Sequence, residues 1–472
     1  MQLYVSNKVF VDEANEEVYK WCKQNLEFPN PEFSKKQNMG FWVGNIEPTI
    51  VLWERKGNTA ILPYGCLEPF RQHFGIPRSE IKYRRKKIHP EPIDYKSSIQ
   101  LFDYQQEVLE NAPAFRSGVI IMPCGSGKTQ TALELVARYQ SRVLWLTHTQ
   151  DLLQQSKERA LSCYGIDPAT MGTISEGKID VGTSITFATV QTMVNIDLDP
   201  YVDYWDVIVV DECHRAVGTP TKLMMFYKVV SKLYAYVKIG LTATPNRNDG
   251  LEKCMFALLG PVLHTVPESA VAKNTVPIKV CVISDTSYDP DPADITKPDG
   301  TLDNNKILQT LCDCDERNRR IADLVNQMNQ SGKTCLVLSD RVDHLKKLRL
   351  LVGEDNTRQI LAKGGSQAAK HERKDTIEKL KNKELRCVFA TYMLAKEGLD
   401  IPTLDCVVFA TPKKDRIAIV QSCGRVGRKA GGKSFGIVLD IVDEKFPTFQ
   451  RYFMRRRSVY KSKKYEVFYA KS

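Results

Sequence analysis

GVIIMPCGSGKTQT, residues 118–131, predicts a buried strand, a glycine-rich turn and the start of a helix, in that order. Gly125 and Gly127 allow the backbone to turn so tightly that successive N–H groups point at one bound anion. The positive end of the following helix adds to the attraction for negative charge. Residues 118–131 therefore indicate a phosphate-binding loop.

The side chains of this loop fit a nucleoside triphosphate with Mg²⁺. Lys128 would reach the outer phosphates, and the Thr129 hydroxyl would hold the metal ion. Met122 stands where the strict GxxxxGK[ST] pattern has its first glycine. A surface turn that carries a lysine is the alternative, but it would lack the apolar strand before the turn and the helix-forming TALELVAR after it. The expected loop consists of Cys124, Gly125, Ser126, Gly127, Lys128 and Thr129.

Length and composition bound the class of protein. The chain has 472 residues, which suggests about three domains, and its 42% hydrophobic and 26% charged residues are typical of a globular protein. No apolar run approaches the roughly 20 residues that span a bilayer, and the N-terminal stretch lacks the features of a secretory signal. We therefore expect a cytoplasmic protein without a membrane partner, and the compact size suggests a prokaryotic or viral origin.

The net charge and the cysteine spacing limit the kinds of partner and metal site that we expect. The net charge of +11 favours a polyanionic partner without saying which one. The 13 cysteines form no CxxC pair, so we expect reduced thiols and no structural metal. The oligomeric state does not follow from the sequence, and a monomer is the simplest expectation.

Four apolar runs after the loop predict a parallel sheet. They are continuous rather than alternating, which is typical of strands that helices cover on both faces. They comprise residues 142–148, 184–189, 205–214 and 237–245. Ligand sites in such sheets lie at the carboxyl ends of the strands, so the functional side chains are expected there.

Asp211 and Glu212 close the strand VIVVD at such an end. Two adjacent carboxylates there are costly unless a cation or a reaction uses them. Asp211 would hold Mg²⁺ through water, and Glu212 would orient and deprotonate the attacking water. An exposed acidic turn is the alternative, but His214 and the later TAT follow in the order that a catalytic site requires.

Gln105 follows Tyr104 on a helix expected before the loop. A glutamine amide donates and accepts hydrogen bonds at once, which is what the adenine edge offers. A solvated glutamine on a helix is the commoner case. Its place upstream of the loop makes Gln105 a candidate for binding the base.

A second α/β series predicts another parallel sheet without a phosphate loop. Its strands are expected at residues 333–339, 386–391, 405–411 and 434–442. Gln421, Arg425 and Arg428 in QSCGRVGR are expected at the start of a helix after the third of these strands. Arginine suits the charge that develops on a transferring γ-phosphoryl group because its planar fork is always ionised. A solvated basic helix is the alternative.

These motifs together carry a family resemblance. YQ, PCGSGKT, DECH, GLTATPNRNDG, GLDIP and QSCGRVGR resemble the motifs of superfamily 2 helicases, most closely the branch of XPB (Rad25/Ssl2) and phage UvsW. The resemblance covers residues from about 100 to 445. It implies two RecA-like domains that bind ATP with Mg²⁺ between them, and an ATPase driven by nucleic acid.

The resemblance also assigns roles to single residues. It implies that Arg425 and Arg428 touch the γ-phosphate as arginine fingers, and that Gln421 pairs with His214 across the cleft. The turn with Gly398 and Asp400 would contact the ribose and the nucleic-acid backbone. In catalysis we thus expect Lys128, Asp211, Glu212, His214, Gln421, Arg425 and Arg428.

Nucleic-acid contacts are expected at loops after the strands. Hydroxyls, amides and arginine at loop tips suit phosphate oxygens without reading sequence, although isolated threonines are more often helix caps or turn residues. The candidates are Thr147 with His148 and Thr149, Thr189 with Gln191 and Thr192, Arg247 and Thr391. The basic, aromatic stretch 446–472 is expected either to grip nucleic acid or to dock on the second domain.

The expected architecture is α/β, with two tandem RecA-like parallel-sheet domains and a small N-terminal α+β accessory domain. The expected boundaries are 1–95 for an accessory, possibly DNA-binding domain, 96–268 for the ATP-binding domain, 269–305 for a linker, 306–445 for the second RecA-like domain and 446–472 for a tail. The expected function is ATP-driven movement on, or remodelling of, DNA, which the resemblance favours over RNA. The alternatives are an RNA helicase and a nucleotide-dependent clamp without turnover.

Overall fold

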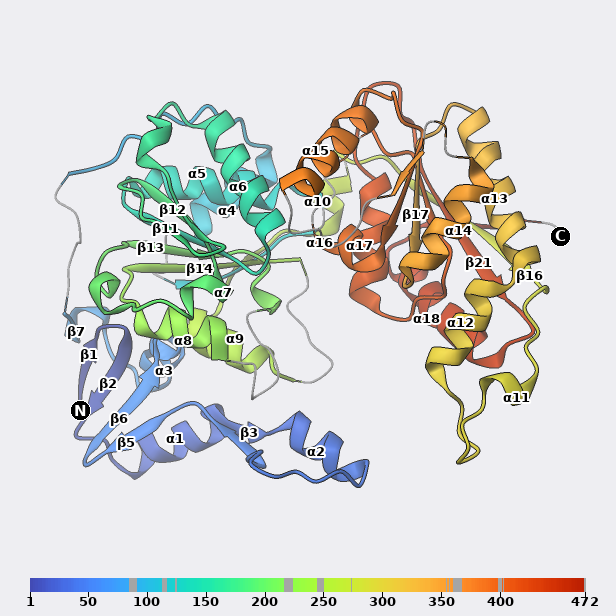
Figure 1. The fold of residues 1–472 in the computed structure, drawn as a ribbon. Coiled ribbons are helices and arrows are strands. Elements are labelled where there is room, and N and C mark those ends of the chain that lie inside the picture. Colours follow the sequence, from blue (N-terminus) through green and yellow to red (C-terminus); the bar gives the residue numbers. More distant parts are fainter. Residues whose placement is uncertain are drawn as a thin grey trace. The chain divides into compact units, whose positions relative to one another are not determined.

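The computed structural model divides the chain into two compact units, Met1–Glu268 and Ser269–Ser472, each described by itself (Figure 1). It describes residues 1–84, 91–112, 117–123, 125–215, 224–243, 250–272, 274–353, 355, 357–359, 367–397, 401 and 403–470. Among these residues no helix combines the length and apolar character needed to cross a bilayer.

An eight-stranded sheet forms the centre of the first unit, in the order β11-β10-β12-β9-β13-β14-β8-β15. Every neighbouring pair is parallel except β10 with β11. The strands are β8 Ser117–Ile121, β9 Val143–Thr147, β10 Gly172–Ser175, β11 Lys178–Asp180, β12 Ile185–Thr189, β13 Val207–Val210, β14 Val237–Thr242 and β15 Val262–Thr265. Strands β9, β12, β13 and β14 are buried along their whole length, as their continuous apolar runs predict.

Helices connect these strands and cover the sheet (Figure 1). They are α4 Asp103–Asn111, α5 Lys128–Tyr139, α6 Gln150–Cys163, α7 Val190–Met193, α8 Met224–Lys232 and α9 Glu252–Leu259. Apolar residues of β9, β13, α8 and α9 meet in one core, so the carboxyl edge of the sheet is held by packing on its faces.

The second unit repeats this arrangement with seven parallel strands, in the order β18-β19-β17-β20-β21-β16-β22. They are β16 Ile278–Asp285, β17 Cys335–Ser339, β18 Thr357–Gln359, β19 Cys387–Thr391, β20 Cys406–Phe409, β21 Gly436–Asp443 and β22 Glu466–Tyr469. Its helices are α11 Pro292–Ile295, α12 Asn304–Asp313, α13 Asp315–Gln330, α14 Val342–Val352, α15 Gln367–Lys381, α16 Tyr392–Glu397, α17 Arg416–Val426 and α18 Pro447–Ser462.

The two sheets share one strand order once the antiparallel β11 is set aside. Numbered by their order in the chain, the strands from β10 to β15 run third, fourth, second, fifth, sixth, first and seventh, and the strands from β18 to β22 run in the same order. In this correspondence β16 takes the place of β8, the strand that leads into the phosphate loop. The expected pair of RecA-like domains is confirmed, and the second lacks a glycine loop after the matching strand.

The stretch 269–305, expected to be a linker, belongs instead to the second unit. Strand β16 pairs with β21 along all eight residues, from Ile278 opposite Gly436 to Asp285 opposite Asp443. Its run IKVCVISD is apolar enough for a central strand, and the Asp- and Pro-rich composition starts only after it. Even there, Tyr288 packs in a small apolar cluster with residues of the C-terminal helix.

The C-terminal stretch is likewise part of the second fold rather than a tail. Helix α18 packs on α17 and β21, and β22 adds to the sheet beside β16. Arg456 is buried and its Nε donates to Asp440, to which the hydroxyl of Tyr460 also donates at 2.7 Å. Docking on the second domain, one of the two expected alternatives, therefore accounts for this helix.

The N-terminal domain has its own five-stranded sheet, in the order β5-β6-β2-β1-β7. Its strands are β1 Gln2–Val5, β2 Lys8–Asp12, β5 Glu54–Lys56, β6 Thr59–Pro63 and β7 Ile81–Tyr83, with helices α1 Glu16–Leu26 and α3 Leu67–His73. A separate ribbon of β3 Glu27–Pro29 and β4 Thr49–Val51 carries the helix α2 Pro31–Asn38 (Figure 1).

This accessory domain packs directly on the first RecA-like domain. Its core includes Tyr234 and Ala257 of that domain. Gly65 approaches the backbone at Gly260 so closely that a Cβ on Gly65 would lie 2.3 Å from the Gly260 nitrogen. The ring of Tyr64 covers the fully buried Lys238, whose Nζ lies 4.6 Å from the ring centroid.

Candidate nucleotide site

The phosphate loop has the conformation that its glycines predict. Gly125 and Gly127 have φ of 80° and 75°, a region that favours glycine. Gly127 caps the start of α5, so Lys128 and Thr129 begin that helix. The Ser126 hydroxyl donates to the Pro123 carbonyl at 2.7 Å, which closes the turn.

Gln105, on helix α4, is hydrogen-bonded to this loop. Its Nε2 donates to the Ser126 carbonyl at 2.8 Å, and its Oε1 accepts from the Phe102 N–H at 2.9 Å. The Tyr104 hydroxyl donates to the same Ser126 carbonyl at 3.2 Å. Gln105 is 1% exposed, so its observed role is to position the loop. The adenine contact stays a prediction.

Asp211 and Glu212 follow β13 at the carboxyl edge, as expected. Asp211 is buried, and burial, followed by repulsion from Glu212, raises its pKa. Glu212 has φ of 50°, a left-handed conformation that is strained for a residue with a side chain. Its Oε1 lies 3.7 Å from Lys128 Nζ, so the glutamate expected to act as the general base is a neighbour of the lysine of the phosphate loop.

His214 links this acidic pair to the next strand. Its Nδ1 lies 3.2 Å from Glu212 Oε2 and 2.9 Å from the Thr242 hydroxyl at the end of β14. The Thr242 carbonyl in turn accepts from the Met122 N–H at 2.9 Å, at the root of the phosphate loop. One chain of contacts thus joins the loop, the carboxylates and the TAT stretch.

The donor set fits Mg²⁺. Thr129 offers a hydroxyl and Asp211 a carboxylate, the hard oxygen ligands that Mg²⁺ uses beside water and phosphate. The burial that raises the pKa of Asp211 would be compensated by a divalent cation nearby. These two residues would hold the metal ion.

Three residues of the first unit that are expected to contact nucleic acid make hydrogen bonds within or between the segments at the ends of β9 and β12. Thr147 is 0% exposed and donates to the Thr149 carbonyl at 3.0 Å, so its hydroxyl shapes the loop and does not reach the surface. Thr189 is nearly as buried and shares a 3.0 Å hydrogen bond with Thr192. Gln191 is exposed, and its Nε2 donates to the His148 carbonyl at 2.6 Å. Contact with nucleic acid stays a prediction for this set.

The second unit has a matching pair of strand ends. Thr189 pairs with Thr147 across β12 and β9, and Thr391 pairs with Ser339 across β19 and β17. Ser339 was missed in the sequence, although its place after KTCLVL matches that of the threonine after RVLWL. Thr391 caps the next helix by accepting from the Leu394 N–H at 3.4 Å.

The arginine motif lies later in its helix than expected. Helix α17 begins at Arg416, because the Asp415 carboxylate caps it by accepting from the Ala418 N–H at 2.7 Å. Gln421 therefore lies at the centre of the helix and Arg425 in its last turn. Arg428 follows the helix and forms a bridge with Thr275, so the two arginines do not share a helix face. Both are partly exposed, and their approach to a nucleotide stays a prediction.

Some expected site residues lie outside the described part of the chain. They are Cys124, Arg247, Gly398 and Asp400. Their assigned roles stay predictions.

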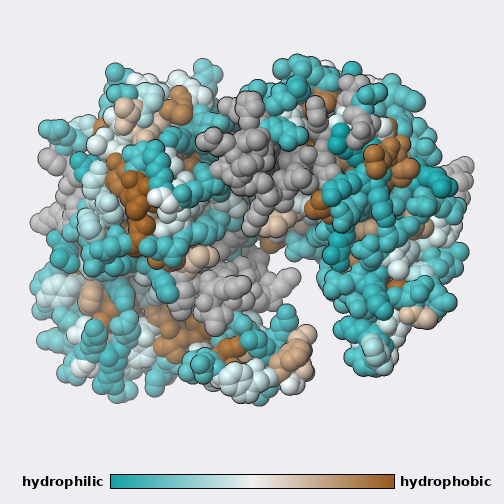
Figure 2. All heavy atoms as spheres, in the orientation of Figure 1, coloured by the Kyte–Doolittle hydropathy of each residue, from teal (hydrophilic) through white to brown (hydrophobic). Residues whose placement is uncertain are grey.

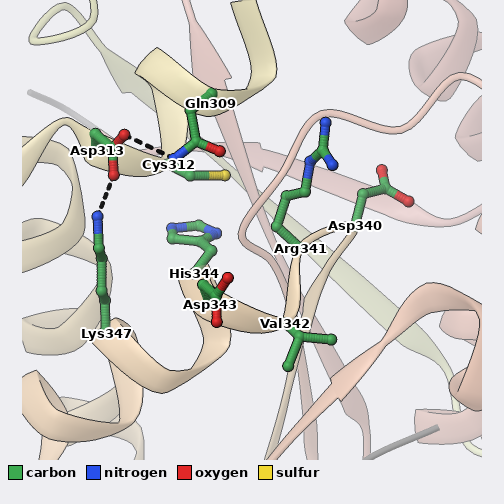
Figure 3. Close-up of a pocket in the computed structure, with 9 residues that line it drawn as sticks. All are labelled: Gln309, Cys312, Asp313, Asp340, Arg341, Val342, Asp343, His344 and Lys347. Atoms are coloured by element: carbon green, nitrogen blue, oxygen red, sulfur yellow. Dashed lines mark hydrogen bonds and ion pairs between the residues drawn. The ribbon is translucent and has the colours of Figure 1, made fainter. Parts of the chain in front are cut away.

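A polar pocket of about 290 Å³ lies where β17 ends and α14 begins (Figure 3). Asp313 on its wall pairs with Lys347 and accepts from Gln309 at 2.8 Å. His344 is buried with both ring nitrogens bonded, to Ser339 at 3.0 Å and Asn318 at 2.8 Å. Burial, then the charge of Arg317, lowers the pKa of His344 to about 3. Asp313 and His344 thus already have hydrogen-bond or ion-pair partners within the protein.

The glycine loop, the carboxylate pair at the strand ends and the repeated parallel sheet define a P-loop fold with two RecA-like domains. Family models agree with each half. Residues 98–247 match the res subunit of type III restriction enzymes, and residues 316–430 match the helicase conserved C-terminal domain.

Relatives agree as well. The chain is 28% identical over 355 residues to a candidate ATP-dependent RNA helicase, L396, of Acanthamoeba polyphaga mimivirus, covering 74% of this chain and 64% of that protein. It is 25% identical over 366 residues to the DNA 3'-5' translocase XPB2 of Sulfurisphaera tokodaii, covering 71% and 80%. The restriction-modification enzyme LlaBIII bound to DNA shares the fold, with a TM-score of 0.58, 19% identity, and coverage of 86% and 34%.

The chain belongs to the superfamily 2 helicases, and XPB proteins are among its relatives, as its motifs indicate. It spans less than two thirds of the mimivirus protein's length.

Proposed function

We propose that this chain is a nucleic-acid-stimulated ATPase that moves on or remodels DNA, by unwinding, branch migration or annealing. The observation that carries the proposal is the position of Glu212 between Lys128, at 3.7 Å, and His214, at 3.2 Å. A glutamate in that position is poised for water activation beside a phosphate-binding lysine.

The contacts of Glu212 also suggest how ATP would act on them. Lys128 is a cationic neighbour of Glu212. When a γ-phosphate binds, the ammonium group of Lys128 would contact the phosphate instead of Glu212. Glu212 would then be released to orient and deprotonate a water. His214, which contacts both Glu212 and the Thr242 hydroxyl, would keep the Glu212 carboxylate in position. Thr129 and Asp211 would hold Mg²⁺, which would supply positive charge to offset that of the triphosphate.

The second unit would complete the site. Arg425 and Arg428 would stabilise the charge of the γ-phosphoryl group, and Gln421 would pair with His214. Gln421 is 7% exposed, and its Oε1 accepts no hydrogen bond from the described residues, which suits such a partner. Hydrolysis would remove the bridge between the domains, so each cycle would alternate their grip on a strand.

DNA is the favoured partner because relatives named as DNA translocases and XPB subunits match most of both RecA-like domains. RNA is the second candidate because the mimivirus relative is named for RNA. ATP turnover should be measured with duplex, forked and single-stranded DNA and with RNA. Stimulation by DNA is expected, and a response to RNA alone would reverse the choice.

The catalytic assignment is tested by Glu212→Gln. We expect ATP binding to remain and turnover to fall at least about 100-fold, because the base is lost. Glu176→Gln is the matched control, since Glu176 is an exposed glutamate with a similar φ of 51°, in the turn between β10 and β11. Unchanged turnover in Glu212→Gln would remove the base role, and absent turnover in the unaltered chain with every nucleic acid would favour a clamp.

A further inference from the structure

The loop after α2 exposes three large apolar side chains within four residues. Trp42 is 85% exposed, Phe41 64% and Met39 59%. Single exposed apolar residues are common, but a cluster of this size on a small domain marks an interaction site. Figure 2 shows pale to brown side chains at the end of the N-terminal domain where α2 lies in Figure 1.

Two features restrict the conformation of this loop. Its two ends are tied through the buried Asn30, whose N–H donates to the Pro48 carbonyl at 2.9 Å and whose Nδ2 donates to the Glu47 carbonyl at 2.7 Å. Gly44 has φ of 44°, and a Cβ there would lie 2.3 Å from the Trp42 ring. The indole thus rests against the Gly44 backbone while its other face is open to solvent. A fixed, exposed aromatic ring loses little entropy on binding.

The domain that carries this loop is joined to the first RecA-like domain. The Asn7 side chain donates to the Ser231 carbonyl at 2.9 Å, and the Tyr64 hydroxyl to the Tyr236 carbonyl at 3.2 Å. Because these contacts link α8 and β14 to the accessory sheet, the loop would move with the domain that binds ATP.

The chemistry of the loop selects its occupant. Indole and phenyl rings stack on nucleobases of any sequence, because every base has a π-face. Lys35 and Lys36 lie in the last turn of helix α2, where Lys36 Nζ is 3.6 Å from Glu32 Oε1, and the Phe41 N–H donates to the Lys36 carbonyl at 2.9 Å. Cationic groups thus lie close in sequence to the rings. Stackable rings beside lysines are the combination that binds single-stranded nucleic acid.

We propose that the Trp42 loop stacks on unpaired bases where single strands leave a duplex, in the nucleic acid on which the motor acts. The proposal rests on the proposed function and adds a contact for the accessory domain. A wedge fixed to one motor domain would keep separated bases from pairing again as the motor advances.

Tryptophan fluorescence tests this contact directly. The chain has five tryptophans, and Trp21, Trp145 and Trp205 are at most 6% exposed, so the exposed Trp42 should dominate quenching by added nucleic acid. A DNA fork with two unpaired arms should quench the emission, and blunt duplex should not. Trp42→Phe should abolish the quenching, whereas Trp53→Phe, the control in the same domain, should retain it.

Affinity separates stacking from general apolar contact. Trp42→Leu should weaken fork binding about tenfold, which equals about 1.4 kcal/mol, while Trp42→Phe keeps most of the affinity. Ile179→Ala, which truncates a 51% exposed side chain on β11, should leave fork binding unchanged. A parallel set with a forked RNA shows which nucleic acid supplies the bases.

Two results would overturn the stacking contact. One is fork binding and quenching that are the same in Trp42→Leu and the unaltered chain. The other is no quenching by any fork while single-stranded DNA still stimulates ATP turnover, which would leave the motor function standing and indicate another occupant, such as a protein. Loss of every nucleic-acid response would refute the proposed function as well.

Discussion

Replacing Lys238 by methionine should change how the stability of the first unit depends on pH. Lys238 is 0% exposed on β14, and its Nζ donates to the Val230 carbonyl at 2.9 Å and faces the ring of Tyr64. Burial lowers the pKa of Lys238 to about 7, against 10.5 for a free lysine. The ring of Tyr64 favours the charged form and works against this shift.

The direction in which stability changes with pH follows from proton linkage. Between pH 7 and 10.5 the unfolded chain holds a proton on Lys238 that the folded chain has lost, so stability rises with pH in this window. The rise is at most about 1.4 kcal/mol per pH unit, so about 2 kcal/mol is expected between pH 7 and 9. Lys238→Met removes this contribution. The difference in unfolding free energy between the variant and the unaltered chain should therefore shrink by about 2 kcal/mol from pH 7 to pH 9.

Urea unfolding followed by tryptophan fluorescence measures this difference. All five tryptophans lie before residue 206, so their emission reports the first unit alone. Comparing the two chains at pH 7, 8 and 9 cancels the titration of other groups. A gap in unfolding free energy that stays constant over this range would show that Lys238 is charged in the folded protein, and would refute the reasoning.

Three further outcomes are expected. Arg425→Ala should lower ATP turnover about 1000-fold in single-turnover assays and leave ATP binding intact, and an unchanged rate would remove it as an arginine finger. Gln105→Ala should raise KM about fivefold to tenfold for ATP and GTP alike, since it loses the hydrogen bond to Ser126; an effect on ATP alone would instead favour an adenine contact. Asp440→Asn should destabilise the second unit by about 3–5 kcal/mol by leaving Arg456 without its carboxylate, seen as an earlier circular dichroism transition with the tryptophan transition unmoved.

The sequence was most informative where one motif requires one conformation. The phosphate loop, the buried strands and the acidic pair were found because Gly125, Gly127 and the runs ending at Asp211 have few other uses. The same patterns do not state how a side chain is satisfied. For Thr147 the sequence predicts either a nucleic-acid contact or a turn role, and the structure adds that its hydroxyl donates to the Thr149 carbonyl in its own loop.

Long-range pairing was the other limit. The sequence predicts a linker over β16 because the Asp- and Pro-rich run beside it dominates the composition, whereas the partner strand, β21, lies more than 150 residues later. The placement of the arginine motif failed for a local reason, since Asp415 starts α17 before the conspicuous residues. The exposure of Trp42 could not be inferred at all, because an aromatic residue in a short apolar run is usually buried.

The meeting of Gly65 with Gly260 has a mechanical consequence. A Cβ on Gly260 would lie 2.7 Å from the Ser117 carbonyl, at the start of β8, so the backbone of three segments is stacked there without side chains between them. A load on the accessory domain would therefore pass to the start of β8, the strand whose other end leads into the phosphate loop. Tension on nucleic acid stacked on the proposed Trp42 contact would reach that loop by the same path.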